Sequence, residues 1–235
     1  MIKLINALGQ EKTLPITMHW RRVPLEIEVP SQPLHGRDGE VVTGKPRRRP
    51  RAFTLEGSIY HPDKSQIEQE ADALLAFLMQ MPVKVYRQHY HDRYLLAYPQ
   101  GAAQDWLDAG AELQLKIPMV ALDPYWYGPE VTANVSGTQT ITIDGNAPAI
   151  PFIQTTGSAS SLTVTNQTTG KQVIVSGASG VIRVDSVNHV VTIDGEERLD
   201  LVNDEWVLRG FELVPGNNQI STNREIRMTY RPRWL

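Results

Sequence analysis

From residue 129 onward, the chain consists of short segments in which apolar and polar residues alternate between turn signals. In residues 160–177, Leu162 and Val164 alternate with threonines, a polar turn follows, and Val173 and Val175 resume the alternation. Successive side chains on a strand point to opposite faces, so this spacing predicts a β-hairpin with one buried face. Residues 181–195 predict a second hairpin. Turn signals at intervals of roughly ten residues predict a β-sandwich of the jelly-roll or lectin-like kind.

An Asp-Gly pair ends two similar segments of this part. The pattern TITIDG at 140–145 returns as VTIDG at 191–195. Asp-Gly favours a tight turn with positive φ, in which the Asp side chain bonds its own backbone. We interpret the recurrence as repeated hairpin patterning and not as a repeat protein; calcium binding by these turns is the alternative.

Before residue 129, one segment has the spacing of an amphipathic helix. Its apolar residues, Ile67, Ala71, Leu74, Leu75 and Leu78, recur every three or four positions. Such a stripe predicts a helix that begins near Asp63 or Ser65 and ends before Pro82. One helix cannot bury its stripe alone, so we expect it to lie on a sheet. Candidate strands occupy 53–60, 83–87, 94–98 and 112–122, which predicts an α+β N-terminal domain.

The segment DPYWYGPE, residues 123–130, lies between the part that contains the predicted helix and the part made of predicted short strands. Its two prolines and one glycine interrupt regular structure, and its three aromatic residues can pack a junction. We place a boundary near 124–132 and predict two domains, 1–128 and 129–235. The fold class predicted for the whole chain is mainly β.

Composition narrows the function classes. With 41% hydrophobic and 21% charged residues the 235-residue chain is expected to fold, and a formal charge of −3 gives no overall attraction to nucleic acid or membrane. The chain has no cysteine, which excludes disulfides, a cysteine nucleophile and cysteine-ligated metals. We expect a soluble protein with a mature N-terminus, because we find neither a secretion signal nor an apolar run long enough to span a bilayer.

The search for catalytic and metal-binding patterns gives only weak candidates. His89 and His91 share a strand face beside Asp92, with His61 elsewhere, but solvated histidines explain them better than a metal site does. A glycosidase needs two carboxylates, yet the turn chemistry explains the acidic residues of the second domain better. Those residues are Asp144, Asp185, Asp194, Glu196 and Glu197. We therefore expect no enzyme, cofactor or metal; a hydrolase built on Asp185 or the histidine pair is a minor alternative.

A basic run is the strongest local charge feature. Within residues 45–51 it contains Lys45, Arg47, Arg48, Arg49 and Arg51. Intervening prolines exclude a helix, so we expect a loop. The loop is either solvated without a partner or a site for phosphate or an acidic protein surface.

Three features together resemble the distal tail proteins of siphophages. The first is the strand, helix, strand order of LEGSIY, IEQEADALLAFL and MPVKVYR, residues 55–60, 67–78 and 81–87. The second is DPYWYG at 123–128. The third is the final segment FELVPGNNQISTNREIRMTYRPRWL, residues 211–235, with its Pro-Gly-Asn and its closing Tyr-x-Pro-Arg-Trp.

This resemblance implies a structural protein of the virion tail tip, made in the bacterial host cytoplasm. It implies a homohexameric ring formed by the N-terminal domain, an open channel for DNA, and a galectin-like β-sandwich as the second domain. Implied partners are the tail tube protein, a tail-associated hub, lysin or fibre protein, and a receptor-binding protein, without specific nucleic-acid binding or membrane insertion. The basic run becomes a candidate interface or channel loop, of which we favour the interface.

A lectin is the competing hypothesis. In it, the β-sandwich binds glycan and the N-terminal part is a dimerisation domain. Trp206 is a candidate for stacking on sugar because it lies in a polar stretch, NDEWVLRG, although burial is its more common fate. The single histidine of the second domain, His189, argues against a galectin-type sugar site.

Overall fold

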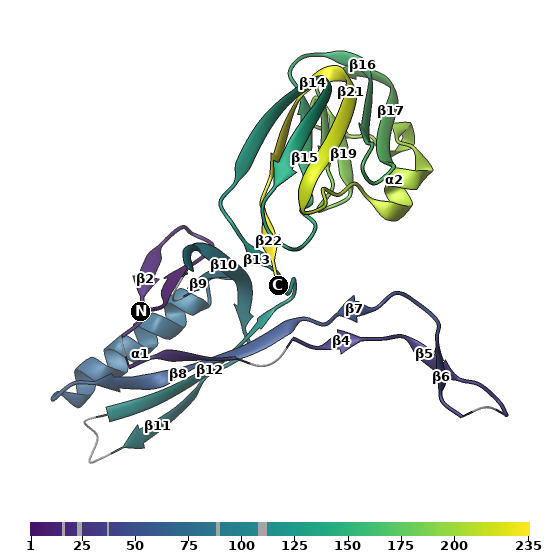
Figure 1. Ribbon diagram of the computed structural model, residues 1–235. Coiled ribbons are helices and arrows are strands. Elements are labelled where there is room, and N and C mark those ends of the chain that lie inside the picture. Colours follow the sequence, from purple (N-terminus) through teal and green to yellow (C-terminus); the bar gives the residue numbers. More distant parts are fainter. Residues whose placement is uncertain (16, 23–24, 37, 88–89, 108–111) are drawn as a thin grey trace. The chain divides into compact units, whose positions relative to one another are not determined.

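The computed structural model describes residues 1–15, 17–22, 25–36, 38–87, 90–107 and 112–235 (Figure 1). The described chain forms two compact units, Met1–Trp126 and Tyr127–Leu235. Most of the regular structure is β-strand, which confirms the predicted fold class. Whether the two units fold as independent domains, as the sequence predicts, stays a prediction.

An antiparallel sheet forms the body of the first unit. Its strands follow the order β2-β1-β9-β10-β12-β8-β3, and β11 pairs with β12. The strands are β1 (Lys3–Ile5), β2 (Glu11–Thr13), β3 (His19–Arg22), β8 (Arg51–Tyr60), β9 (Val83–Arg87), β10 (Tyr90–Pro99), β11 (Ala103–Leu107) and β12 (Glu112–Ala121). The four predicted strands of this part are confirmed as parts of β8, β9, β10 and β12. A short strand, β13 (Trp126–Tyr127), follows at the junction of the units.

Helix α1 (Lys64–Leu78) begins and ends where the sequence predicts. Asp63 is its N-cap: its carboxylate accepts a hydrogen bond from the Ser65 backbone N–H at 2.9 Å. The apolar stripe Ile67, Ala71, Leu74 and Leu78 is buried against β8 and β12, whose alternate residues supply the other side of this core. In the described ranges no helix is long and apolar enough to cross a membrane.

A long hairpin between β3 and β8 has no counterpart in the sequence predictions. Two short antiparallel ladders build it: β4 (Ile27–Glu28) pairs with β7 (Arg47–Arg48), and β5 (Ser31–Pro33) pairs with β6 (Glu40–Val42). Figure 1 shows these strands extending away from the sheet of the first unit as a narrow ribbon. We call residues 25–50 the arm.

One curled antiparallel sheet forms the second unit. Its order is β17-β16-β21-β15-β18-β19-β20, and β14 pairs with the other edge of β21. The strands are β14 (Val131–Ile143), β15 (Phe152–Thr155), β16 (Ala159–Asn166), β17 (Lys171–Gly180), β18 (Ile182–Asp185), β19 (Val190–Ile193), β20 (Glu196–Glu197) and β21 (Gly216–Tyr230). The short strand β22 (Arg233–Trp234) follows and is not part of this sheet. Both predicted hairpins are confirmed, as β16–β17 and β18–β19.

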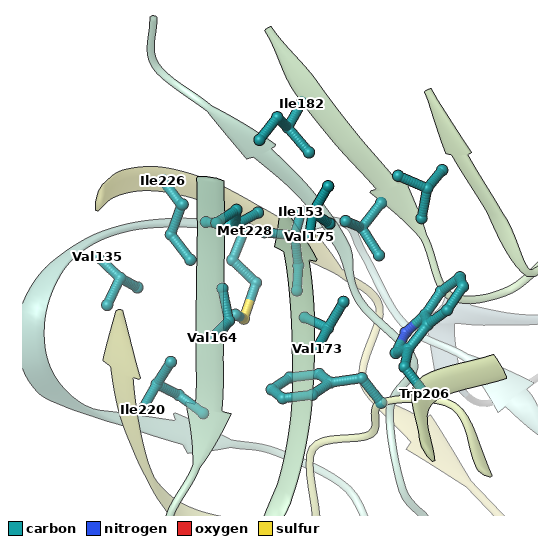
Figure 2. Packing of buried hydrophobic residues seen from close by; sticks show 14 of the residues in the cluster. Val135, Ile153, Val164, Val173, Val175, Ile182, Trp206, Ile220, Ile226 and Met228 are labelled. Carbon is teal, nitrogen blue, oxygen red and sulfur yellow. The ribbon is translucent and has the colours of Figure 1, made fainter. Parts of the chain in front are cut away.

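The strand β21 bends this sheet into a sandwich. On the same edge of β21, β16 pairs with its first half at Ile220–Thr222 and β15 pairs with its second half at Ile226–Thr229. The register against β14 shifts between Val135 and Gly137, and such an irregularity lets a strand pass from one layer to the other. Figure 2 shows apolar side chains from these strands meeting between the layers, among them Val164, Ile220 and Met228.

A short helical segment closes one side of the sandwich, where the sequence suggested only strands. It contains a 3₁₀ turn, Leu199–Leu201, and α2 (Asp204–Arg209). Trp206 of α2 is completely buried in the sandwich core (Figure 2). Asn203 pairs with Ile174 of β17 in both directions: its backbone N–H donates at 3.0 Å and its side-chain oxygen accepts at 2.8 Å. The segment therefore covers part of the outer edge of β17.

The two Asp-Gly pairs differ in the structure. Asp194 and Gly195 both have positive φ, 51° and 94°, and turn the chain from β19 into β20, as predicted. Asp144-Gly145 makes no hairpin: Gly145 bridges to Arg233, and β14 pairs with the distant β21. The Asp194 carboxylate accepts from the Val181 N–H at 2.8 Å, so it bonds the connection between β17 and β18 and not its own backbone.

Candidate interaction surface

The basic run lies at the root of the arm, where the arm joins the sheet. Arg47 and Arg48 form β7, opposite Glu28 and Ile27 of β4, and Arg51 is the first residue of β8. The prediction that this run is a loop is therefore wrong in part. The run is extended chain. Pro46 and Pro50 lie outside the two-residue strand β7, so the ladder does not need the N–H groups that prolines lack.

Part of the positive charge is offset within the arm. The Arg49 guanidinium lies 3.6 Å from the Glu26 carboxylate and 3.5 Å from that of Glu28. These pairs are more than half exposed and contribute little to stability. Among the described residues, neither Lys45 nor Arg47 has a carboxylate within ion-pair distance. The surface therefore keeps local positive charge.

Arg48 has a fixed partner from outside the arm. Its Nη1 donates a hydrogen bond to the hydroxyl of Tyr125, and its guanidinium lies 5.2 Å from the centre of the Tyr125 ring. A stacked guanidinium has fewer conformations to lose when it binds an anion. Beside it is an open hollow of about 520 Å³, which we call the root pocket. Its lining residues are Ile27, Pro46, Arg47, Arg48, Pro124 and Tyr125.

Aromatic side chains anchor the root of the arm in the first unit. The rings of Trp20 and Phe53 stack with centroids 4.3 Å apart, and Trp126 lies 5.1 Å from Trp20. The Arg51 guanidinium lies 5.9 Å from the Trp126 ring. Arg51 therefore belongs to this half-buried anchor, whereas the other four basic residues of the run are exposed.

The arm exposes apolar side chains at its root and beyond it. Ile27, Val29, Leu34, Val41 and Val42 are between 41% and 60% exposed. A two-stranded hairpin has no second layer on which to bury such residues, and an isolated hairpin is marginal in water. Apolar side chains gathered on a projecting element are typical of an interaction surface.

A second hollow, of about 670 Å³, lies on the face of the β8–β12 sheet opposite α1. It is lined by Arg21, Thr54, Glu56, Ala102, Ala103, Lys116 and Pro118. Glu56 lies 3.2 Å from His19 Nε2 and 4.0 Å from Arg21. Two cations, Arg21 and Lys116, and one carboxylate, Glu56, line this hollow, so part of its positive charge is offset. The root pocket is lined by two arginines and no carboxylate and is the better candidate for binding an anionic partner.

The other candidates from the sequence do not assemble into a site. His89 lies outside the described residues, and the side chain of His91 does as well. The Asp185 carboxylate is occupied by its own turn, where it accepts from the N–H groups of Val187 and Asn188. Within the described ranges, no three His, Asp or Glu side chains gather as a metal site would require.

The shifted pKa values of Asp63, Asp200 and Tyr230 have local causes. Hydrogen bonds from the Ser65 side chain and backbone lower the pKa of Asp63, and a hydrogen bond from Arg198 lowers that of Asp200. Burial raises the pKa of Tyr230, with a smaller effect of Asp144. These groups cap a helix, pair on the surface or fill the core.

Part of the sequence and the fold of the whole chain match known proteins. Residues 144–234 match the family described as siphovirus-type tail component, C-terminal domain. The structure is similar to the crystal structure of phage SPP1 Dit (gp 19.1), described as a paradigm of the hub adsorption apparatus in phages that infect Gram-positive bacteria; TM-score is 0.76 and identity 18%, over 100% of both chains. It is also similar to a chain of the phage P2 baseplate in its activated conformation with calcium, with TM-score 0.55, 9% identity, and coverage of 98% of this chain and 97% of that chain.

No curated protein matches the sequence. The strontium form of the P2 baseplate gives nearly the same similarity as the calcium form, with a TM-score of 0.53 and 9% identity over 97% of both chains. The resemblance to the siphophage distal tail proteins is thus confirmed: residues 144–234 match the siphovirus-type tail component C-terminal domain, and the whole chain is similar in fold to SPP1 Dit.

Proposed function

We propose that this protein is the distal tail protein of a siphophage or prophage, a structural subunit that forms a homohexameric ring at the tail tip. One ring face meets the tail tube protein, the other meets a tail-associated hub, lysin or fibre protein, and DNA passes through the open centre. The second unit provides attachment for a receptor-binding protein. The family match over residues 144–234 supports the structural tail role, and the fold shared with SPP1 Dit supports the place at the hub. We propose no enzymatic activity.

The exposed arm is the feature that most supports the proposed ring. A cyclic homo-oligomer larger than a dimer needs a heterologous interface, in which one patch of a subunit meets a different patch of the next. The arm projects from the sheet and leaves five apolar side chains exposed, which is the form expected of an element that completes its packing on another chain. Its basic root extends the same surface, which favours the interface role over a channel lining.

The lectin alternative has lost its main support. Trp206, the residue proposed to stack on sugar, is completely buried, and His189 lies 5.6 Å from it, between ring centres. A buried indole offers no face to a glycan.

Electron microscopy tests the ring directly. We expect negative-stain images of the purified protein to show six-fold rings with an open centre, increasing with concentration, and light scattering to give the matching mass. A variant in which an Asn-Gly turn replaces residues 29–46 is the control: it should stay monomeric and unfold at the same denaturant concentration. Rings formed equally well by this variant would exclude the arm as the ring contact. A wild-type chain that stays monomeric both alone and with its tail tube protein would contradict the hexamer.

A further inference from the structure

Helix α1 carries an acidic face that its own unit leaves unpaired. Glu68, Glu70 and Asp72 are exposed. Glu68 and Asp72, four residues apart, lie on the same side of the helix, and Glu70 lies on another part of its exposed surface. Among the described residues, none of these three carboxylates has an ion-pair partner. The apolar stripe of α1 is buried on the sheet, and these exposed carboxylates lie outside it, where they can meet another chain.

The root pocket has the complementary character. Arg47 is exposed, and Arg48 is held by Tyr125, so two guanidinium groups border one hollow. Ile27, Pro46 and Pro124 give it apolar walls. Such a pocket suits a carboxylate on a short aliphatic stem, because the stem packs on the walls while the charge meets the guanidinium.

We propose that the root pocket of one copy binds the acidic face of α1 of the next copy. The inference rests on the proposed ring and specifies its two contact patches. The two patches are different surfaces of the same unit and have opposite charge, as a heterologous interface requires.

A second copy fits the pocket better than nucleic acid does. A phosphate-binding surface is expected to carry positive charge over a wide area, but Glu28 of the β4–β7 ladder and the nearby Glu26 pair with Arg49. The apolar walls also have no role on a phosphate backbone. Charge that is local, partly offset and bordered by apolar groups is typical of a protein–protein contact.

Cross-linking tests the contact at one position, and the chain suits it because it has no cysteine. Ile27→Cys and Gln69→Cys, introduced together, place one thiol in the root pocket and one on the acidic face without removing a charge. A short bismaleimide should join them into a ladder of covalent multimers. Ile27→Cys paired with Glu197→Cys, an exposed position of the second unit, should give no ladder. Absence of a ladder from the first pair would overturn the proposal.

Neutral variants test the direction of the contact. Arg47→Gln/Arg48→Gln and Glu68→Gln/Glu70→Gln/Asp72→Gln should each raise the concentration for half-assembly by about tenfold or more. When the two are mixed, only one kind of contact remains, so the mixture should give 1:1 dimers and nothing larger. Glu196→Gln/Glu197→Gln is the matched control and should assemble like the wild type.

The outcomes separate this inference from the ring itself. If the wild type and both neutral variants form the same rings, the contact patches are wrong and the ring stands. If the wild type forms no ring and the cysteine pair gives no ladder, both proposals fail. Fluorescence anisotropy with a short labelled DNA duplex, at about 150 mM salt, distinguishes the other ligand: DNA binding that Arg47→Gln/Arg48→Gln abolishes, with rings intact, would reassign the root pocket to phosphate.

Discussion

Gly57 shows how tightly a single position is constrained. It lies in the middle of β8, where the chain before β3 passes close by: a Cβ at this position would lie 2.5 Å from the Met18 Cα and 2.5 Å from the Thr17 carbonyl oxygen. Both neighbours are backbone, so neither can move aside as a side-chain end does. We expect Gly57→Ala to destabilise the first unit by about 2 kcal/mol or more.

Denaturant unfolding followed by tryptophan fluorescence measures this loss, with the transition of the second unit as an internal reference. Gly44→Ala is the matched control. A Cβ there would lie 3.4 Å from the Pro30 side chain, an ordinary contact, and should change stability by less than about 0.5 kcal/mol. Equal effects of the two substitutions would show that close backbone approach is not what requires glycine in β8.

The sequence does not reveal this role. In LEGSIY a glycine within an alternating segment signals a bulge, a weak strand or a close approach, and the chain that makes the approach is some forty residues earlier. The same limit applies to the Asp194 carboxylate, whose partner is Val181 in the connection between β17 and β18. Local patterns predict the backbone of such residues and not the contacts that fix them.

At the scale of elements, the cap of α1 gives a pH-dependent prediction. The pKa of Asp63 is lowered below its ordinary value of 3.8, chiefly by the hydrogen bonds from Ser65. Because the folded pKa lies below the unfolded one, the cap contributes stability above the unfolded value and loses it as pH falls through the folded value. We expect Asp63→Ala to lower the unfolding midpoint of the first unit near neutral pH, and the difference from wild type to shrink as the carboxyl is protonated.

Asp63→Asn separates the charge from the cap. An amide oxygen still accepts the Ser65 N–H but does not titrate in this range. Unfolding measured from neutral pH down to below 3.8 should therefore show a midpoint for this variant that responds less to acid than that of the wild type. A wild type and an Asp63→Ala variant that differ equally at all pH values would exclude the carboxylate as the source.

Elements whose burial follows a local period were predictable. The spacing of apolar residues predicted the buried stripe of α1 and the hairpins β16–β17 and β18–β19, because each of these elements has one buried face. The arm was not predictable in this way, since its apolar residues are exposed and its ladders are only two and three residues long. Helix α2 was missed because six residues are too few to establish a helical period.

At the scale of the whole molecule, long-range pairing determines what sequence patterns leave open. The sequence predicts strands from residue 129 onward, but the closure of the sandwich depends on β21 pairing with β14, β15 and β16 from up to about 100 residues away. The candidate surface has the same origin. The basic run is visible in the sequence, whereas the partners of its arginines, Glu26 and Tyr125, come from the other strand of the arm and from the end of the unit.

The second unit has what an independent domain requires. Its core cluster lies entirely between Val135 and Tyr230, and the ends of the unit meet, with the Gly128 N–H donating to the Pro232 carbonyl at 2.9 Å. We therefore expect a fragment of residues 127–235 to fold alone and to unfold in one cooperative transition. Circular dichroism during thermal unfolding measures this, and light scattering should find a monomer, because the proposed ring contacts all lie in the first unit.

A fragment of residues 137–235 tests whether the boundary itself matters. It lacks the first part of β14, which pairs Val131–Val135 with Ile226–Tyr230 and contributes buried Val135 to the core. Removing that segment exposes the second half of β21 along one edge and opens one end of the core, so this fragment should be markedly less stable or unfolded. Two fragments of equal stability would place the boundary later than residue 128. Rings formed by residues 127–235 alone would move the assembly contacts from the arm to the second unit, and both proposals on the arm would fail together.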